Sequence, residues 1–370
     1  MDGREPREVA VTGLGVFSAF GRGAEPLAAA VASGAAAFAP VTRFDTGRRS
    51  VRVAAHSPGA PDLIEEVLVA LDAAGRQAGL GPDADTPILL ALHAQPNTAG
   101  TAAAIGRAAA ADLGFRGVER VYTCACVAAS TAVADAAALI SLGLRDRVAV
   151  AAGYLVEPDT FAVFDAGRAL AGDGRARPFS RDRSGLVLGD AAAAVVLESA
   201  DRARLRGAPA LATLAGWGRA GDAHHVCRPI PDGSGLARAV ESALRRAGLR
   251  PEEIGYVNAN ATGSPVGDGS EVAALHRALG PWAGRVPASS TKSVHGHALE
   301  ASALLELIVT ILALRSHSLP VNAGYLGPDE GLEPGLDLVL DAGRRAEARY
   351  ALTLNAAFGG ANTALLVGAP

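Results

Sequence analysis

Three segments of the sequence carry side chains that could do covalent or acid–base chemistry, and the first centres on a thiol. Cys126 lies in RVYTCACVA (120–128), where a strand-like run turns into an Ala-rich helical segment at 130–144. The N-terminus of a helix offers free N–H groups and positive potential, which lower a thiol pKa and stabilise an oxyanion. Cys126 is therefore suited to be a thioester-forming nucleophile, although a cysteine can equally be a small buried apolar residue. Cys124 faces the same way on a strand, so the pattern does not choose between the two.

The second segment, STKSVHGHALE (290–300), combines a lysine and two histidines. Lys292 is the only lysine among 34 basic residues. Lysine provides a compact point charge that the planar guanidinium of arginine does not replace, which indicates a specific role for this ammonium. His297 follows five residues later, at the start of an apolar helical segment. A lone histidine is usually structural and His295 competes for the role, but the cluster favours a site.

Two further segments are polar or glycine-rich where strands end. NANATGSPVGD (258–268) offers amide, hydroxyl and carboxylate groups, with Asp268 as its only titrating base. Such a composition is ordinarily that of a loop. NAAFGGAN (355–362) places Gly359 and Gly360 inside a strand pattern, which indicates close approach of the backbone to a ligand or another loop.

Alternating strands and helices must position these segments. The expected strands are 86–94, 120–128, 147–155, 191–199 and 210–218, and the expected helices between them include 63–80, 101–114 and 130–144. This alternation predicts an α/β protein whose sheets are covered on both faces.

The pattern then repeats along the chain. Residues 236–263 echo 63–98, residues 285–314 echo 120–144, and residues 350–368 echo 185–198 as a strand pair interrupted by glycine. The repetition predicts a duplicated fold. We expect an N-terminal half at 1–208 that carries the cysteine and a C-terminal half at 209–370 that carries Asn260, Lys292 and His297, with one shared core.

Composition limits the classes of function. Of the 370 residues 49% are apolar and only 4% aromatic, and the net charge is -4. No nucleic-acid partner is expected from this balance. Three cysteines make no disulfide framework, the N-terminal segment has no apolar signal core, and the apolar segment 298–314 carries two glutamates. We therefore expect a cytoplasmic protein with no membrane span.

Taken together, these segments resemble the β-ketoacyl-ACP synthases of the thiolase-like superfamily, in the family's order and over nearly the whole chain. The matching segments are REVAVTGLGVFSAFG (7–21), RVYTCACVAAS (120–130), RALAGDGRARPFSRDRSGLVLGD (168–190), YVNANATGSPVGD (256–268), SSTKSVHGHALEASALLE (289–306) and AAFGGAN (356–362). The resemblance implies a duplicated five-layer α-β-α-β-α fold.

The resemblance also implies roles for individual residues. Cys126 matches the family's nucleophile, and Cys124 falls where the family usually has Thr. Lys292 and Glu306 match the charge network near the second catalytic His, which is His297. The remaining matches are Thr262 and Ser264 for contact with pantetheine, Phe358, Gly359 and Gly360 for the C-terminal aromatic turn, and Asp268 as a supporting carboxylate.

The chain departs from the family at its first catalytic His, which is Asn260 here. Asn can donate a hydrogen bond to an oxyanion but cannot act as an acid or base near neutral pH. Losing one such donor typically costs ~10²–10³ in rate. Some relatives in the superfamily pair a Cys with one His and one Asn. Further departures are Ala129, Ala261, Glu300 and Ala356, in place of Gly, Gly, Gly and Phe, and a shortened region at 93–119.

Three functions follow from the resemblance. The first is an enzyme that accepts an acyl group from acyl carrier protein on Cys126 and performs a decarboxylative Claisen condensation in fatty acid or polyketide biosynthesis. The second is a non-decarboxylating acyltransferase. The third is an inactive partner similar to the chain-length factors of type II polyketide synthases. The resemblance implies a phosphopantetheine-bound acyl or malonyl group on the carrier, a homodimer or a heterodimer with a second ketosynthase-like chain, and no cofactor or metal.

Overall fold

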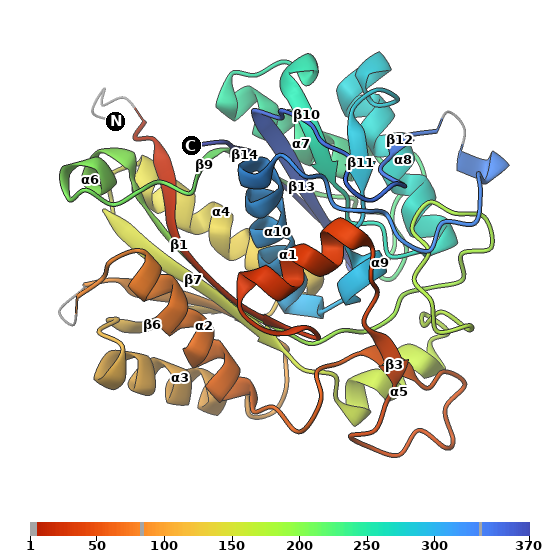
Figure 1. Cartoon of the computed structure of the whole chain (residues 1–370), viewed down its shortest axis with the longest axis horizontal. Coiled ribbons are helices and arrows are strands. Elements are labelled where there is room, and N and C mark those ends of the chain that lie inside the picture. The colour runs from red at the N-terminus through yellow and green to blue at the C-terminus, as the bar shows by residue number, and fades with distance from the viewer. Residues whose placement is uncertain (1–5, 82–84, 333–334) are drawn as a thin grey trace.

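The apolar runs of the sequence form the strands of a layered α/β structure in the computed structural model (Figure 1). The structure describes residues 6–81, 85–332 and 335–370, so residues 1–5 of the N-terminal segment lie outside it. Most strand residues are buried on both faces, which is typical of sheets that helices cover on either side. None of the helices described within these ranges is long and apolar enough to cross a membrane.

The strands of the first half follow the order β6-β5-β7-β8-β1 across the sheet. β6, β5 and β7 are parallel, whereas β8 is antiparallel to both β7 and β1. Parallel neighbours need a crossover connection, which the intervening helices supply. The bounds are β1 Val9–Ser18, β5 Pro87–Leu92, β6 Gly117–Tyr122, β7 Arg147–Tyr154 and β8 Ala191–Ser199.

The second half repeats this order and these directions as β11-β10-β13-β14-β9, with β12 beyond β11. A short pairing of Ala10 with Thr213 and Val11 with Ala212 joins β1 to β9. The bounds are β9 Ala212–Gly221, β10 Ile254–Asn258, β11 Pro287–Ser289, β12 Asp337–Leu338, β13 Tyr350–Ala357 and β14 Ala361–Gly368.

Helices form three layers around the strands (Figure 1). α2 and α3 cover the outer face of the first half, and α7 and α8 lie outside the second. α4 and α10 lie between the halves and contact strands of both. The duplicated five-layer fold is thereby confirmed. The bounds are α2 Leu63–Gln77, α3 Thr98–Asp112, α4 Ala128–Ser141, α7 Ser234–Ala247, α8 Pro265–Leu279 and α10 Ser302–Ser316.

Shorter elements connect these. They are β2 Gly21–Arg22, α1 Ala24–Ser33, β3 Phe38–Pro40, β4 Val53–Ala55, α5 Pro158–Ala166, α6 Ala200–Leu205 and α9 Lys292–His295, and the 3₁₀ turns η1 Ala125–Val127, η2 Pro251–Glu253, η3 Gly280–Trp282, η4 Leu299–Ala301 and η5 Glu330–Leu332.

Glycines bring the outer helices close to the strands at equivalent places in both halves. A Cβ on Gly15 of β1 would lie 2.0 Å from the Ala70 carbonyl oxygen of α2. A Cβ on Gly218 of β9 would lie 1.9 Å from the Ala239 carbonyl oxygen of α7. Only a residue without Cβ permits this contact, so each half uses glycine to seat its outer helix.

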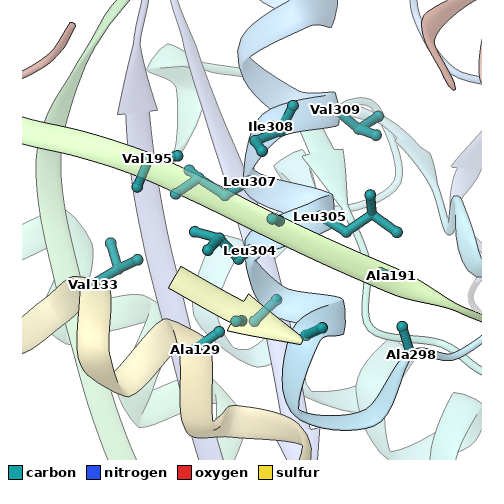
Figure 2. Close-up of a cluster of buried hydrophobic side chains, with 14 of the residues drawn as sticks. Ala129, Val133, Ala191, Val195, Ala298, Leu304, Leu305, Leu307, Ile308 and Val309 are labelled. Atoms are coloured by element: carbon teal, nitrogen blue, oxygen red, sulfur yellow. The ribbon is translucent and has the colours of Figure 1, made fainter. Parts of the chain in front are cut away.

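The core lies between the halves, around α10. Figure 2 shows Leu304 and Leu307 of α10 packed among apolar side chains of α4 and β8, including Val133 and Val195. α10 is apolar around its whole circumference, as expected of a helix buried on all sides. The one charged side chain buried in α10 is that of Glu306, which is paired with Lys292.

Two details differ from the sequence expectations. The segment 285–314 is not a strand, turn and single helix, because α9 and η4 precede α10, which begins at Ser302. The strand pair at 350–368 is a hairpin of β13 and β14, but its counterparts are β7 and β8. The long connection 155–190 separates β7 from β8. The predicted equivalence of 350–368 with 185–198 is therefore correct only for the second strand of the pair.

Candidate active site

Cys126 lies on η1, between the end of β6 and the start of α4. Ala125 adopts a left-handed φ of 53°, an unfavourable conformation for a residue with a Cβ. This sharp turn points the Cys126 thiol into the molecule, where the side chain is 7% exposed. The predicted strand–thiol–helix arrangement is therefore present, with a 3₁₀ turn inserted.

The expectation that Cys124 and Cys126 face the same way is wrong. Cys124 is exposed and Cys126 is buried. The strand ends at Tyr122, so the alternation of a strand no longer applies at Cys124.

His297 contacts the thiol directly. Its Nε2 lies 3.1 Å from Cys126 Sγ, and its Nδ1 lies 2.8 Å from Ser302 Oγ. The His297 N–H donates to the Val187 carbonyl, and the His297 carbonyl accepts from the Gly189 N–H. These two backbone hydrogen bonds hold the residue in place. The hydroxyl of Ser302 also accepts from the Ala298 N–H, so the helix start that positions His297 is fixed by the same side chain.

His295, the competing histidine, belongs to a different environment. Its Nδ1 donates to the Gly296 carbonyl at 2.8 Å, which leaves Nε2 to accept from the Thr291 hydroxyl at 2.9 Å. Burial lowers the pKa of His295 to about 3, so it is neutral. Both ring nitrogens are occupied, and among the described residues only His297 contacts the thiol.

The single lysine lies behind this pair. Lys292 is 1% exposed, and its Nζ lies 2.5 Å from Glu306 Oε1. The other carboxylate oxygen of Glu306 accepts from Asn355 Nδ2 at 2.7 Å. A buried charge needs both a counter-charge and hydrogen bonds, and this arrangement supplies them.

Asn260 faces the same ammonium. Its Oδ1 lies 3.5 Å from Lys292 Nζ, which orients the carboxamide with its oxygen toward the cation and its NH₂ group available as a donor. The backbone N–H of Asn260 donates to Glu271 Oε1 at 2.7 Å. Burial raises the pKa of Glu271 to about 8, although the Asn260 N–H and the Lys292 charge act in the opposite direction.

Asp268 joins loops and does not contact the thiol. It accepts from the backbone N–H of Phe179 at 2.8 Å and of Gly263 at 3.2 Å. Burial raises its pKa to about 6. Ser264 caps α8, since its hydroxyl accepts from the Gly267 N–H at 3.0 Å, and Thr262 is half-buried on the same turn.

The C-terminal aromatic turn lies between β13 and β14. Phe358 is 52% exposed and stacks on Phe164 of α5 with ring centroids 6.1 Å apart. Gly359 and Gly360 have φ values of 87° and 73°, and a Cβ on Gly360 would come 2.9 Å from the Cβ of Asp222. β13, which leads into this turn, packs against η1 and Cys126.

Sequence reasoning missed a second buried charge beside the thiol. Glu300 was noted only as a departure from glycine, yet both its carboxylate oxygens bond His93 Nδ1, at 2.9 and 3.1 Å. His93 is the first residue after β5, and its side chain is partly exposed. No local motif links residues 207 positions apart. The signal available was the placement of a charged residue at the start of an apolar helix.

These surroundings set the protonation of the resting pair. Burial, followed by the Glu300 charge, raises the pKa of Cys126 to about 12, while Lys292 acts to lower it. Burial and the Lys292 charge hold the pKa of His297 well below its usual range. A neutral thiol therefore faces a neutral imidazole, which can accept the thiol proton or donate from Nε2, depending on its tautomer.

The fold and the Cys–His pair define a protein of the thiolase-like superfamily. Two family models match adjoining parts of the chain: β-ketoacyl synthase, N-terminal domain, over residues 83–203, and β-ketoacyl synthase, C-terminal domain, over residues 211–325. The chain belongs to the β-ketoacyl synthase family.

Curated relatives agree. The chain is 40% identical over 261 residues to 3-oxoacyl-[acyl-carrier-protein] synthase 2 of Vibrio cholerae, an alignment that covers 68% of this chain and 63% of that protein. It is 34% identical over 262 residues to the Staphylococcus aureus synthase 2, covering 69% of this chain and 64% of that one. The matched region thus spans less than two thirds of the length of these relatives.

Solved structures resemble the chain over nearly its full length. The ishigamide ketosynthase/chain length factor superposes with a TM-score of 0.89 and 28% identity, covering 99% of this chain and 100% of that one. A β-ketoacyl synthase from Burkholderia phymatum gives a TM-score of 0.84 at 26% identity, covering 98% and 100%.

Proposed function

We propose that this protein is a condensing enzyme that carries an acyl group on Cys126. The observation that carries the proposal is the 3.1 Å contact between Cys126 Sγ and His297 Nε2 at the N-terminus of α4. The proposed acyl donor is a thioester of acyl carrier protein, by analogy with the carrier named for the curated relatives. Residues 1–208 and 209–370 would form the two halves that supply the thiol and the imidazole.

In the first step the thiol gives its proton to His297 Nε2 and the sulfur attacks the carbonyl carbon of the carrier thioester. The tetrahedral oxyanion collapses, the carbon–sulfur bond to the carrier breaks, and the departing carrier sulfur takes the proton from His297. Free N–H groups at the start of α4, two residues after Cys126, would stabilise this oxyanion. Because the resting pKa of Cys126 is high, proton transfer to His297 has to accompany attack.

In the second step a malonyl group on the carrier loses CO₂, and the resulting enolate attacks the acyl carbon on Cys126. The new carbon–carbon bond forms as the carbon–sulfur bond breaks, and the released Cys126 thiolate takes up a proton from water. The enolate oxygen needs hydrogen-bond donors, for which we propose the NH₂ group of Asn260 and His297 in the tautomer that carries its proton on Nε2. Lys292 would act as a positioning residue, since it faces the Asn260 carboxamide oxygen.

The main alternative is an acyltransferase that does not decarboxylate malonyl groups. Asn260 favours it, because an amide offers a hydrogen bond but cannot act as an acid or base near neutral pH. An inactive, chain-length-factor-like partner is the less favoured alternative, since the thiol and the imidazole are retained in contact and the buried lysine is retained beside Asn260.

We also propose a dimer, of identical chains or with a second ketosynthase-like chain. β6 forms one end of the large sheet, and Val121 on it is 37% exposed. An uncovered edge strand presents unpaired backbone groups to another chain.

We propose that five residues would contact the pantetheine arm of the carrier. Thr262 is half-buried and Phe358 is exposed, and the others are Ser264, Gly359 and Gly360.

The test is to incubate the full chain with acyl-carrier thioester and measure the mass of the peptide that contains Cys126. We expect one acyl adduct, absent in Cys126→Ala and retained in Cys124→Ser, whose thiol is exposed. No adduct would exclude both enzymatic functions. An adduct without release of CO₂ from malonyl-carrier would favour the acyltransferase.

A further inference from the structure

A second candidate site lies at the far end of β7 from the thiol. A surface pocket of about 240 Å³ opens where β7 begins, β8 ends and α6 follows. Its lining is Asp146, Arg147, Glu198, Arg202, Leu205 and Arg206. Tyr154, at the other end of the strand, packs against His93, so the two regions are separated by the length of β7.

Both carboxylates of the pocket already have partners. Glu198, 1% exposed, accepts from the Thr12 hydroxyl at 2.6 Å and from Arg206 Nε at 3.0 Å. Asp146 accepts from Arg7 at 2.8 Å and lies 3.6 Å from Arg202 Nε. Neither carboxylate is left to balance another cation.

Arg147 is that remaining cation. No hydrogen bond or ion pair links its side chain to any described residue, and its Nε is buried without a partner. Glu198 is its cross-strand neighbour but is bonded to Arg206. Burial lowers the pKa of Arg147, the Glu198 charge acts in the opposite direction, and the Arg206 and Arg202 charges add to the lowering. Because Glu198 is already bonded to Arg206, the chain only partly offsets the cost of the Arg147 charge.

The charges around the pocket are therefore unbalanced. Three guanidinium groups, of Arg147, Arg202 and Arg206, line the pocket beside two carboxylates. One of these carboxylates, that of Asp146, also pairs with Arg7, so positive charge is in excess. Guanidinium groups match the oxygens of phosphate in geometry and bind them through paired hydrogen bonds. A ligand with two negative charges would neutralise the pocket.

We propose that this pocket binds a phosphate-bearing small molecule, with Arg147 as its principal ligand-binding residue. Leu205, 83% exposed on the pocket wall, offers an apolar surface for the organic part of such a ligand. The site does not depend on Cys126 and stands whether or not the chain catalyses a condensation.

Calorimetric titration of the full chain with inorganic phosphate, at matched ionic strength in chloride, tests the proposal. We expect one saturable site that binds more tightly at pH 8 than at pH 6, because phosphate becomes a dianion over this range. Butyl phosphate should bind more tightly than inorganic phosphate in the wild type but not in Leu205→Ser. Equal binding of both in the wild type would restrict the ligand to free phosphate.

Arg147→Gln should weaken phosphate binding by about 10- to 100-fold, the value of a charge-assisted hydrogen bond. Arg204→Gln is the matched control, because Arg204 lies on the same α6 but pairs with Asp201 outside the pocket. Arg147→Gln removes no hydrogen bond or ion pair among the described residues, so its melting temperature in chloride should not fall. If phosphate stabilises both variants equally, or binds neither saturably, the proposal is wrong.

Discussion

Glu300 and His93 form a hydrogen-bonded pair, at 2.9 and 3.1 Å, that links the start of η4 to the end of β5 beside the thiol. Glu300 is 3% exposed, so its charge is felt across a poorly screened interior. It is the largest cause after burial of the raised pKa of Cys126. The hydrogen bond to Glu300 in turn raises the pKa of His93. The pair couples an accessible titrating group to the nucleophile.

Glu300→Gln should lower the pKa of Cys126, because a negative charge disfavours the thiolate and its removal favours it. Each unit by which the pKa falls makes the thiolate about tenfold more abundant at a given neutral pH. The pH dependence of alkylation by iodoacetamide, in a background of Cys124→Ser and Cys227→Ser, measures this. Glu157→Gln is the control, since Glu157 acts on His93 but is not among the causes of the Cys126 shift. Unchanged alkylation in Glu300→Gln would refute the coupling.

Ser302→Ala should slow acylation of Cys126 by about 5- to 10-fold, the effect of losing one neutral hydrogen bond. Ser302 bonds His297 Nδ1 and thereby holds the ring nitrogen that faces the sulfur. Ser302→Thr should restore the rate, because its hydroxyl occupies the same place. Single-turnover acylation is the measurement, and an equal loss in Ala and Thr variants would indicate a packing effect instead.

Asn260→His should increase the release of CO₂ from malonyl-carrier, because an imidazole supplies a donor at the position of the family's first histidine. Asn260→Ala, which removes the carboxamide, should reduce any condensation by about 10²–10³-fold. The backbone bond to Glu271 is retained in both variants. Radiolabelled malonyl-carrier gives the rates, and no CO₂ release above background from either wild type or Asn260→His would exclude a pocket built for decarboxylation.

Lys292→Met should lower the free energy of unfolding by about 3–5 kcal/mol, because Glu306 would be left as an unpaired buried charge. The double variant Lys292→Met, Glu306→Leu should recover much of this loss, since neither charge remains. Denaturant unfolding of both variants provides the comparison. A double variant as unstable as the single one would show that the ammonium has structural partners other than Glu306.

Stability should decrease as the pH rises from about 6.5 to 8, and Glu271 is the main expected cause. Its folded-state pKa is raised from 4.5 to about 8, so in this window the folded protein holds a proton that the unfolded chain has lost. The slope is then at most about 1.4 kcal/mol per pH unit for this group. Glu271→Gln mimics the neutral acid and should flatten the slope, as measured by unfolding at several pH values. Below about pH 6.5 the raised pKa of Asp268 adds to the effect of Glu271, but the lowered pKa values of His295 and His297 act in the opposite direction and offset it.

How much of the fold and of the site could be predicted depends on whether a feature is set by residues close in the sequence or by residues far apart. Periodicity and apolar runs are local, and they located α2, β5, β7 and β8 to within a few residues. The echo of residues 63–98 in residues 236–263 predicted a duplicated fold, which requires no knowledge of contacts. The resemblance then singled out the thiol and the imidazole, which the structure brings within 3.1 Å of each other.

What escaped prediction is set by contacts between distant residues or by single backbone angles. The left-handed φ of Ala125 directs the side chains of Cys124 and Cys126 to different environments, and nothing in the local composition predicts this backbone angle. Glu300 and His93 meet only because η4 lies against β5. In the sequence Ser302 is an ordinary small residue of an apolar helix, and its hydrogen bond to His297 is evident only in the structure.

The thiol and the imidazole come from different halves of the duplicated chain, and α4 and α10 between the halves set their separation. A displacement of one half against the other by about 1 Å would take sulfur and nitrogen out of hydrogen-bonding range. The reactivity of Cys126 therefore reports how the two halves are positioned relative to each other. Weaker packing of the leucine side chains of α10 should be detected first as a loss of Cys126 reactivity.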